Sequence, residues 1–557
     1  MAFWRVRVIV DRGMTQTNAF GEICQTVRNP SIFLHCFAAK IHVFFYFSSM
    51  TYSVVWFKRD LRLHDHAALT LAAARGPVLC LYVIEPALWA AQDAANQHYQ
   101  FLLESLAELD TALARRGGYL HVAVGDLIDV LDELHRKLPF AHMYAHEETG
   151  NDISYQRDLA VGRWCRAHQV GWQETPQFGV VRRLKDRNKW QRHWEAHVAQ
   201  ACLPIPALEF VVSPVTPALV PAPETLGLAA YDPPQRQRGG RRQAVSVLQS
   251  FLMDRSGQYR GGISSPLSAP TACSRLSPYL AFGALSLREI VHATRKQLAT
   301  MSPAESRRKA GLTGFTSRLY WHCHFIQKLE SEPELECRNL HRGYDGLRES
   351  DWNQQHFDAL VAGRTGWPLV DACVEMLRQT GWLNFRMRAM LVSVAAYPLW
   401  LHWRPVGLWL ARQFLDYEPG IHWSQLQMQS GTTGINVPRI YNPIKQAHDH
   451  DPHGHFVRRW LPAMRKVPDA WLFEPWRMPP DLQARYGVIV GKDIPMPLVD
   501  LEQATRLAKE KLFGLRAQPA VRDGQAAIVE KHGSRRRGRD RTAGKEVHVA
   551  QQLTLEF

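Results

Sequence analysis

The stretch VVWFKRDLRLHDHAAL, Val54–Leu69, contains the residues on which the fold prediction rests. It opens inside a short apolar run, Ser53–Phe57, that is typical of a buried strand, and PVLCLYVI (Pro77–Ile84) predicts a second strand. Further strands are expected near 119–124 and 141–146, with amphipathic helices at 97–115 and near 127–137. Short apolar strands alternating with helices predict a parallel α/β sheet with right-handed crossovers. No GxGxxG follows the first strand, so the dinucleotide fingerprint is absent.

The composition changes twice beyond this α/β region. Residues 203–243 contain eight prolines, which exclude regular helix and inner strand and predict a long connector. From 244 to 512 almost every segment has helical periodicity, which predicts an all-helical domain. We therefore expect an α/β domain at 50–202, the connector, the helical domain, and a basic disordered tail at 513–557. Residues 1–49 are expected to be a disordered extension, or sequence translated ahead of a start at Met50.

Charge and cysteine usage limit the class of protein. The 557-residue chain carries a formal net charge of +15, which favours a polyanionic partner. Its nine cysteines are scattered without a CxxC pair, which argues against zinc, iron–sulfur and disulfide frameworks and for a reducing cytosol. The apolar stretch 32–47 is interrupted by charged and histidine residues and is marginal for a membrane span. We expect a cytoplasmic, nucleoid-associated monomer with no membrane partner.

Four histidines, His448, His450, His453 and His455, alternate with two aspartates in HDHDPHGH. Imidazole and carboxylate groups are ligands for transition metals, but nothing in this spacing fixes a tetrahedral geometry. We expect no metal here and interpret the segment as a solvent loop that is rich in histidine.

Three groups of motifs, in order over residues 52–480, resemble the photolyase/cryptochrome family. The first is Val54–Leu69 and the second is SRLSPYLAFGALS, Ser274–Ser286. The third is a series in the second half of the chain: GRTGWPLVD (Gly363–Asp371), TGW (Thr380–Trp382), RMR (Arg386–Arg388), RIYNPIKQ (Arg439–Gln446) and FVRRWLP (Phe456–Pro462). The resemblance implies an N-terminal α/β domain and an all-helical domain that holds FAD. In repair members, excited reduced flavin donates an electron to a pyrimidine dimer that is flipped out of the duplex.

The resemblance also implies a set of flavin contacts. Hydroxyls and free N–H groups before Pro278 favour phosphate binding, although Ser277 alone would suit an ordinary N-cap. Arg388 and Asp416 correspond to the family's ion pair beside the flavin ring, which would favour reduced, anionic flavin. His422 stands where relatives have Asn facing flavin N5, and a histidine there can donate, accept or carry a charge. The other implied contacts are Tyr259, Ser274, Arg275, Leu276, Tyr417 and Glu418, with Trp382 and Asn384 on the helix that faces FAD.

The substrate pocket implied by the resemblance contains several departures. Trp321 corresponds to the tryptophan that stacks on the dimer. However, Arg318 replaces a Glu, His322 replaces an Arg, and Met428 replaces the second stacking Trp of repair enzymes. The candidate DNA-binding residues are Trp321, His322, Arg386, Met428, Arg439 and Lys445, whose cations would make binding salt-dependent and blind to sequence.

The electron relay implied by the resemblance is incomplete. Trp403 matches its middle member and Trp352 lies near the outer position. The inner position is Leu426, which cannot carry an electron hole, and either Trp423 or Trp400 is a candidate to replace it.

Two further segments suggest partners. HEETGN, His146–Asn151, corresponds to the loop where many relatives hold a folate or deazaflavin antenna, with Glu148 as a polar contact. The same loop also closes the fold in members without an antenna, so a second chromophore stays unidentified. The final residues Gln552–Phe557 (QLTLEF) resemble the peptide by which bacterial repair proteins dock on the sliding clamp, with an incidental terminus as the alternative.

We therefore predict a light-driven, FAD-dependent photolyase for cyclobutane pyrimidine dimers in damaged DNA. The (6-4) repair branch carries a catalytic histidine pair where this chain has Phe385 and Ala389, which favours cyclobutane dimers. Arg318, His322, Met428 and His422 favour a cryptochrome-type photoreceptor instead. A flavin-binding protein that has lost its activity is the third possibility.

Overall fold

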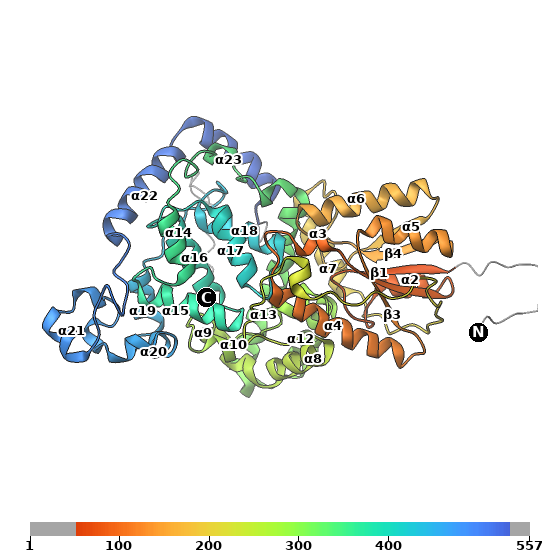
Figure 1. The fold of residues 1–557 in the computed structure, drawn as a ribbon, viewed down its shortest axis with the longest axis horizontal. Helices are drawn as coiled ribbons and strands as arrows, with labels where there is room; N and C mark the ends of the chain where they lie inside the picture. The colour runs from red at the N-terminus through yellow and green to blue at the C-terminus, as the bar shows by residue number, and fades with distance from the viewer. Residues whose placement is uncertain (1–51, 535–557) are drawn as a thin grey trace, which may run out of the picture. The chain divides into compact units, whose positions relative to one another are not determined.

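The computed structural model describes residues 52–534. The predictions for residues 1–49, for the part of the basic tail after residue 534 and for Gln552–Phe557 lie outside this range. Five strands form one parallel sheet in the order β3-β2-β1-β4-β5 (Figure 1). They are β1 Ser53–Phe57, β2 Val78–Ile84, β3 Leu120–Val124, β4 His142–His146 and β5 Gly171–Thr175.

Both faces of the sheet are buried because side chains alternate along each strand. Val54 and Trp56 pack in one cluster with α5 (Leu127–Lys137) and α6 (Asp152–Ala167). Val55 and Phe57 belong to another cluster with α2 (Ala67–Ala73) and α4 (Asn96–Ala114). The predicted parallel α/β architecture is thereby confirmed. The short helices α3 (Pro86–Trp89) and α7 (Trp190–Ala199) complete this region.

The connector contains little regular structure, as its prolines predict. It forms one short 3₁₀ turn, Pro223–Leu226, and a bridge between Phe210 and Val78 beside the sheet. Helical structure resumes at Arg241 in α8 (Arg241–Ser250), three residues before the expected start of the helical domain.

The helical region follows. Its helices are α9 Ser256–Gly262, α10 Ala269–Ala272, α11 Ser277–Ala281, α12 Leu287–Thr300, α13 Ser306–Ser331, α14 Gln354–Ala362, α15 Pro368–Thr380, α16 Phe385–Ala396, α17 Trp403–Gln413, α18 Pro419–Ser430, α19 Pro443–His450, α20 His455–Trp460, α21 Pro480–Tyr486, α22 Leu501–Arg516 and α23 Pro519–His532. None of the helices between residues 52 and 534 is both long and apolar enough to cross a membrane.

The expected disordered tail from residue 513 is wrong over its first part. Helix α22 continues to Arg516, and α23 extends the helical structure to His532. Val521 is buried, and its carbonyl oxygen accepts a hydrogen bond from His341 Nε2 at 2.7 Å. This docking stabilises a segment whose local sequence, with Gly524 in its middle, gives only a weak helical signal.

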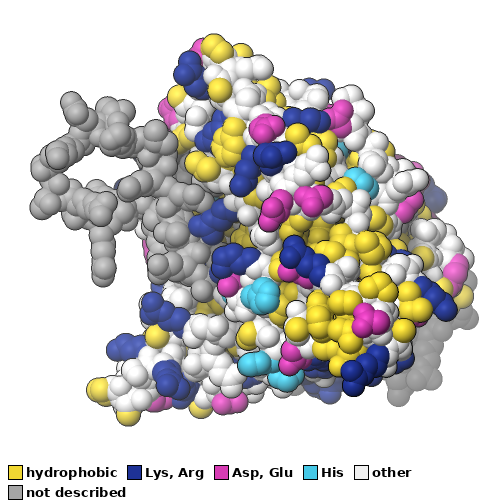
Figure 2. Space-filling model, turned by 90° about the vertical axis from the view of Figure 1, so that its left-hand side faces the viewer, with side chains coloured by type: hydrophobic (Ala, Val, Ile, Leu, Met, Phe, Trp, Pro, Cys, Tyr) yellow, Lys and Arg dark blue, Asp and Glu magenta, His cyan; other side chains and the backbone are white. Residues whose placement is uncertain are grey.

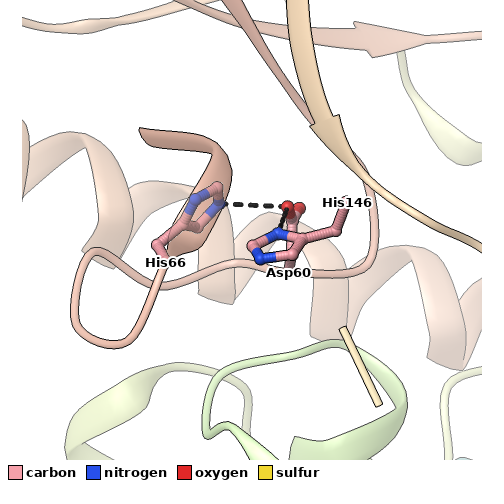
Figure 3. A group of neighbouring side chains, drawn as sticks. All are labelled: Asp60, His66 and His146. Atoms are coloured by element: carbon pink, nitrogen blue, oxygen red, sulfur yellow. Dashed lines mark hydrogen bonds and ion pairs between the residues drawn. The ribbon is translucent and has the colours of Figure 1, made fainter. Parts of the chain in front are cut away.

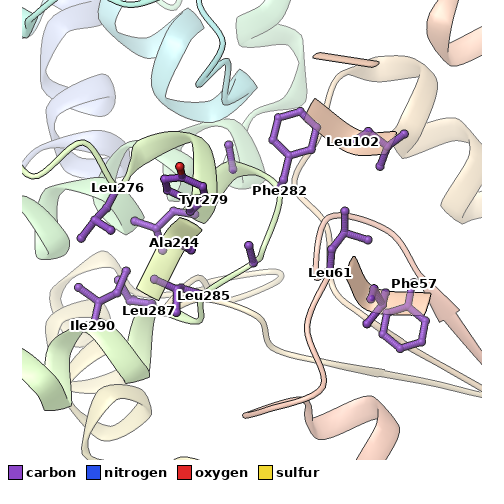
Figure 4. Close-up of a cluster of buried hydrophobic side chains, with 14 of the residues drawn as sticks. Phe57, Leu61, Leu102, Ala244, Leu276, Tyr279, Phe282, Leu285, Leu287 and Ile290 are labelled. Carbon is purple, nitrogen blue, oxygen red and sulfur yellow. The ribbon is translucent and has the colours of Figure 1, made fainter. Parts of the chain in front are cut away.

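One hydrophobic core joins the sheet region to the helical region. Phe57 and Leu61 from the β1 end and Leu102 of α4 belong to the same buried cluster as Phe282 and Leu287 (Figure 4). The rings of Phe101 and Phe282 lie 4.8 Å apart between centroids. A shared core of this kind fixes the two regions against each other, because neither surface can be exposed without losing apolar burial.

Candidate functional site

Helices α13, α16 and α18 bring the candidate residues of the helical region together. Helix α18 packs against α13, α16 and α17. Its start lies close to α13 because Gly420 has no side chain, and a Cβ there would stand 2.6 Å from the Cα atom of Ile326. Since His422 and Met428 lie on α18, Trp321 on α13 and Arg388 on α16, the three helices form one shared framework.

Arg388 and Asp416 form the predicted ion pair. Arg388 Nη1 lies 2.9 Å from Asp416 Oδ1, and Nη2 donates to Oδ2 at 3.0 Å. The guanidinium also donates from Nε to the Leu383 carbonyl and lies 4.1 Å from the ring centroid of Phe414. Burial would raise the pKa of Asp416, but Arg388 and a hydrogen bond from Ser277 hold that pKa below its usual value. The pair is therefore a fixed, ionised dipole.

The segment Ser274–Ser277 lies beside this pair. Helix α11 begins at Ser277, and its N-cap is Leu276 without a side-chain cap, so Ser277 is not the N-cap. The side chain of Ser277 is instead exposed and reaches Asp416. Arg275 adopts a left-handed backbone conformation (φ 60°), and its guanidinium lies 3.9 Å from the ring centroid of Trp382. Burial lowers the pKa of Arg275 to about 10.

Trp382 and Asn384 are not on a helix, contrary to the prediction. Gly381, at φ 63°, ends α15 in the left-handed conformation, and the chain turns before α16 begins at Phe385. Asn384 is the N-cap residue of α16, and its Nδ2 donates to the carbonyls of Ile263 and Ser264, both at 2.9 Å. Trp382 is buried in the turn.

Buried polar atoms near this turn fit a polar ligand. Asn384 Oδ1 and Ser264 Oγ are buried without a hydrogen-bond partner within residues 52–534. Each such atom costs about 1–3 kcal/mol if it stays unsatisfied. A cofactor with many donors and acceptors, such as FAD, would satisfy groups of this kind.

His422 has a defined protonation state. Its Nε2 lies 2.9 Å from the Gly407 carbonyl oxygen, which can only accept, so Nε2 carries the proton. Burial lowers the pKa of His422 to about 4, which keeps the ring neutral near pH 7. Of the three states that the sequence left open, the structure favours a neutral ring with Nδ1 as an acceptor. The rings of Tyr417 and Trp423 lie 5.1 and 4.9 Å from it between centroids.

Tyr417 and Glu418 direct their polar groups to the α/β region. Tyr417 donates its hydroxyl to Asp93 at 2.7 Å, and Glu418 pairs with Arg59 at 3.2 Å. Burial raises the pKa of Glu418 to about 7 against the opposing effect of Arg59. The flavin role of these two residues stays a prediction. Tyr259 is buried and makes a hydrogen bond with Arg318, and its burial raises the pKa of the phenol.

The candidate substrate residues lie on the neighbouring helices α13 and α18. Trp321 is partly exposed and stacks on Phe325, with 5.8 Å between ring centroids. His322 is partly exposed against the ring of Phe178, and burial lowers its pKa to about 4. Met428 is partly exposed on α18.

The candidate phosphate contacts differ in how exposed their side chains are. Arg386 and Arg439 are partly exposed, whereas Lys445 is exposed and paired with Asp449 at 2.7 Å. Figure 2 shows Lys and Arg side chains around a hydrophobic area on one face, rather than one continuous basic patch.

The rings of Trp403 and Trp423 lie next to each other, and the ring of Trp423 also contacts His422. Their centroids are 6.0 Å apart, and Trp403 Nε1 donates to Asn339. Trp352 packs on Phe357 and makes no ring contact with Trp403 in the part of the chain that the structure describes. Trp400 instead lies under the cations of Arg348 and Lys511. Of the two replacements for Leu426, the ring contacts favour Trp423.

A buried trio at the carboxyl ends of β1 and β4 was missed by sequence reasoning. Asp60 Oδ2 accepts from His146 Nδ1 at 2.7 Å and lies 3.0 Å from His66 Nε2 (Figure 3). His66 Nδ1 accepts from the Leu69 amide, so its proton faces Asp60. These residue types can bind a metal, and the hydrogen bond between Asp60 and His146 already uses two of the three facing atoms. The sequence could have pointed to them, because Asp60 follows the first predicted strand and His146 ends another.

More side chains fill the same edge of the sheet. In open α/β sheets, the usual ligand site is a crevice at the carboxyl ends of the strands, at the point where the strand order reverses. Here Lys58 pairs with Asp158 at 2.9 Å, and Arg157 pairs with Glu148 at 2.6 Å and Glu85 at 3.0 Å. A cavity of about 1140 Å³ lies farther out, beside α6, and includes Glu148–Asp152 in its lining.

Comparisons with known proteins agree with this architecture. Residues 53–183 match the family described as DNA photolyase, and residues 315–513 match the FAD binding domain of DNA photolyase. A cryptochrome DASH of Gloeobacter violaceus is 28% identical over 515 residues, covering 88% of this chain and 98% of its own. A deoxyribodipyrimidine photo-lyase of Salmonella typhimurium is 28% identical over 501 residues, covering 85% and 99%.

Solved structures show the same fold. A bacterial class III photolyase from Agrobacterium tumefaciens gives a TM-score of 0.72 at 24% identity, covering 84% of this chain and 98% of that one. A cryptochrome of Synechocystis gives 0.73 at 22% identity, covering 83% and 99%. The α/β sheet followed by a helical FAD-binding region defines a flavoprotein of this architecture. The chain belongs to the photolyase/cryptochrome family.

Proposed function

We propose that this protein is a light-driven lyase that splits cyclobutane pyrimidine dimers in DNA. The observation that carries the proposal is the ionised Arg388–Asp416 pair with the exposed Ser277 beside it, within the region that matches the FAD binding domain of DNA photolyase. The relatives include proteins named deoxyribodipyrimidine photo-lyase, which supports the repair reaction.

The residues that would hold FAD are those around this pair. Ser274, Arg275 and Ser277 would hold its phosphates, and Asn384 and Asp416 would accept from its polar groups. Tyr259, Leu276, Tyr417 and Glu418 complete the proposed set. Bound FAD supplies the electron that light drives to the substrate. Arg388 and Asp416 keep a fixed dipole in place, and the neutral His422 offers Nδ1 only as an acceptor.

DNA would contact the partly exposed side chains of the helical region. Trp321 offers a face on which an unstacked base can lie, with His322 and Met428 as neighbouring candidates. Arg386 and Arg439 would contact phosphates. Lys445 is a weaker contact, because it must first leave Asp449.

A direct test uses purified, photoreduced holoprotein and oligonucleotides that contain a cyclobutane dimer, single- and double-stranded, under blue light. We expect light-dependent loss of dimers. Trp321→Ala should remove most of this loss while retaining FAD, and Trp89→Phe, a partly exposed tryptophan of α3, should not. Absence of light-dependent repair by protein that holds FAD would reject the lyase.

The second candidate is a photoreceptor of the cryptochrome type. The observation that favours it is Arg318, which stands where repair enzymes carry a Glu and makes a hydrogen bond with Tyr259. Dimer binding without light-dependent splitting, combined with reversible photoreduction of FAD, would support this function instead.

We also propose two partners. A second chromophore, folate or deazaflavin, would bind in the cavity beside Glu148, and absorption spectra of the ligands released on denaturation would reveal it. The peptide Gln552–Phe557 would dock on the replication sliding clamp, so its deletion should abolish binding to purified clamp.

A further inference from the structure

The indole of Trp403 is held by a chain of hydrogen bonds that the proposed function does not yet use. Trp403 Nε1 donates to Asn339 Oδ1 at 2.7 Å, and Asn339 Nδ2 donates to Asp345 Oδ1, also at 2.7 Å. Trp403 and Asn339 are buried, whereas Asp345 is exposed. The chain therefore connects a buried aromatic ring with a carboxylate at the surface through a single amide.

The position of Asn339 is fixed from helix α18. Gln427 lies one helical turn after Trp423 and is completely buried. Its Oε1 accepts from the Leu340 amide at 2.6 Å, and its Nε2 donates to the Arg338 carbonyl at 2.7 Å. Asn339 lies between these two anchored residues, so its backbone is held on both sides and its side chain is kept in place toward the indole.

An electron hole on Trp403 needs compensation at this position. Trp403 is the first residue of α17, where the positive end of the helix dipole opposes a positive charge. The ring of His402 lies 5.4 Å away between centroids and is neutral near pH 7, because burial lowers its pKa although Glu349 and Asp345 oppose this. The field of the Asp345 carboxylate thus already reaches the ring beside Trp403.

The chain suits the oxidised indole better than the neutral one. Loss of one electron makes an indole N–H a much stronger hydrogen-bond donor. The Asn339 carbonyl oxygen accepts that bond, but an amide is too weak a base to take the proton. A carboxylate at the far end of the chain polarises the amide, and a charge-assisted bond is stronger than a neutral one. The chain therefore stabilises a positive ring and leaves the proton on Nε1.

We propose that Asn339 and Asp345 are positioning residues that stabilise the oxidised, protonated form of Trp403 and so retain the electron hole there. One electron passes from Trp403 to oxidised Trp423, which is thereby restored, and no proton moves. An external thiolate, which becomes a thiyl radical, later returns the electron to Trp403. The inference rests on the proposed light-driven function with Trp423 as the inner member of the relay.

The simplest alternative is that Asn339 only satisfies a buried N–H group. The protein offers a matched comparison, because Trp352 Nε1 donates to Gln354 Oε1 at 3.0 Å and Gln354 Nε2 donates to Asp358 Oδ1 at 2.7 Å. Trp352 makes no ring contact with Trp403 within residues 52–534. Asp358→Asn therefore removes the same charge from the same kind of chain at a place outside the proposed path.

The test is flash absorption spectroscopy of the full chain loaded with oxidised FAD, without an external reductant. Native protein should form a long-lived Trp radical with the absorption of the protonated radical cation, and Trp403→Phe should remove it. Asp345→Asn keeps an acceptor for the amide but removes the charge, and should lower the yield of this radical on the order of fivefold. Asp358→Asn should leave the yield unchanged. Both aspartates are exposed, so neither variant should change the unfolding temperature.

Exchanging the two residues gives a second readout. The double variant Asn339→Asp, Asp345→Asn keeps the composition and the net charge, but it places the carboxylate directly on the indole N–H. The oxidised indole should then lose its proton to the new carboxylate and show the absorption of a neutral Trp radical. A purely structural role of Asn339 predicts neither this change of spectrum nor the effect of Asp345→Asn.

The proposal is wrong if native protein forms no long-lived Trp403 radical, or if that radical is already neutral. It is also wrong if Asp345→Asn and Asp358→Asn give the same yield, or if the exchange leaves the radical protonated. Dimer splitting by native protein whose flavin has been reduced chemically draws no electron from Trp403. The lyase reaction and this inference can therefore fail separately.

Discussion

At the residue scale, the best-defined contact of the proposed flavin site is Asp416 with both terminal nitrogens of Arg388. Asp416→Asn keeps the shape but leaves the Arg388 charge without its partner. Breaking a buried pair in this way costs about 3 kcal/mol. We expect a lower unfolding temperature and a reduced ratio of flavin to protein absorbance after gel filtration. Asp449→Asn, in the exposed pair with Lys445, is the matched control and should change neither quantity.

Glu418 makes stability depend on pH in a definite direction. Burial raises its folded pKa from 4.5 to about 7, although Arg59 opposes this. Between these two values the native state holds a proton that the unfolded state has lost. The stability contributed by this group is therefore present at low pH and is lost as the pH rises toward 7, by about 1.4 kcal/mol per pH unit at most.

The measurement compares native protein with Glu418→Gln by urea unfolding from pH 5 to pH 8. The variant does not titrate, so the difference in unfolding free energy should move in its favour as the pH rises. A difference that stays constant over this range would show that Glu418 is already ionised at pH 5.

How much of the site could be predicted differs from residue to residue. The Arg388–Asp416 pair was predicted, because the resemblance to the photolyase/cryptochrome family implies it. The neutral state of His422 could not be, because it results from burial by other helices, and its tautomer is set by the carbonyl of Gly407 on another helix.

At the scale of elements, the contact of α17 with α18 places Trp403 beside Trp423. If Trp423 replaces Leu426 as the inner member of the electron relay, Trp423→Phe should slow photoreduction of bound FAD on the order of tenfold. Trp352→Phe should have a much smaller effect, because its ring contacts only Phe357 among the described rings. Bleaching of the flavin band under blue light with an external reductant measures both rates. Equal rates for the two variants would exclude this path.

Element boundaries were predicted best where the apolar pattern was strong. Strand β1 was predicted without error, and the helix at Leu127–Lys137 was also found. Strand β5 was missed because GWQET has no apolar run, and its place in the sheet depends on pairing with β4. Helix α23 was missed because contacts with distant residues stabilise it, including His341 and Glu332.

At the scale of the whole molecule, the turn between β1 and α2 attaches the sheet region to the helical region. Arg59 donates to the carbonyls of Ala281 and Tyr417, at 2.7 and 2.8 Å. Asp65 is completely buried and accepts from Arg288 at 2.6 Å and from Ser286 Oγ at 2.5 Å. Burial would raise the pKa of Asp65, but these partners lower it to about 2.

Asp65→Asn tests this attachment. Asp65 has a left-handed backbone (φ 53°), which Asn tolerates well, so the change isolates the loss of charge. We expect a loss of about 3 kcal/mol in unfolding free energy, measured by chemical denaturation. Asp469→Asn, which removes an exposed partner of Arg458, should leave the unfolding midpoint unchanged. An equal effect of both changes would mean that Asp65 does not join the two regions.

The turn at residues 58–66 has a consequence for exchanging modules between relatives. By sequence position it belongs to the first module, yet the side chains of Arg59 and Asp65 contact the second. A chimera joined in the proline-rich connector would separate Arg59 and Asp65 from the partners they evolved with. Grafting a foreign α/β region onto this helical region should therefore succeed only when residues 58–66 are transplanted back with it.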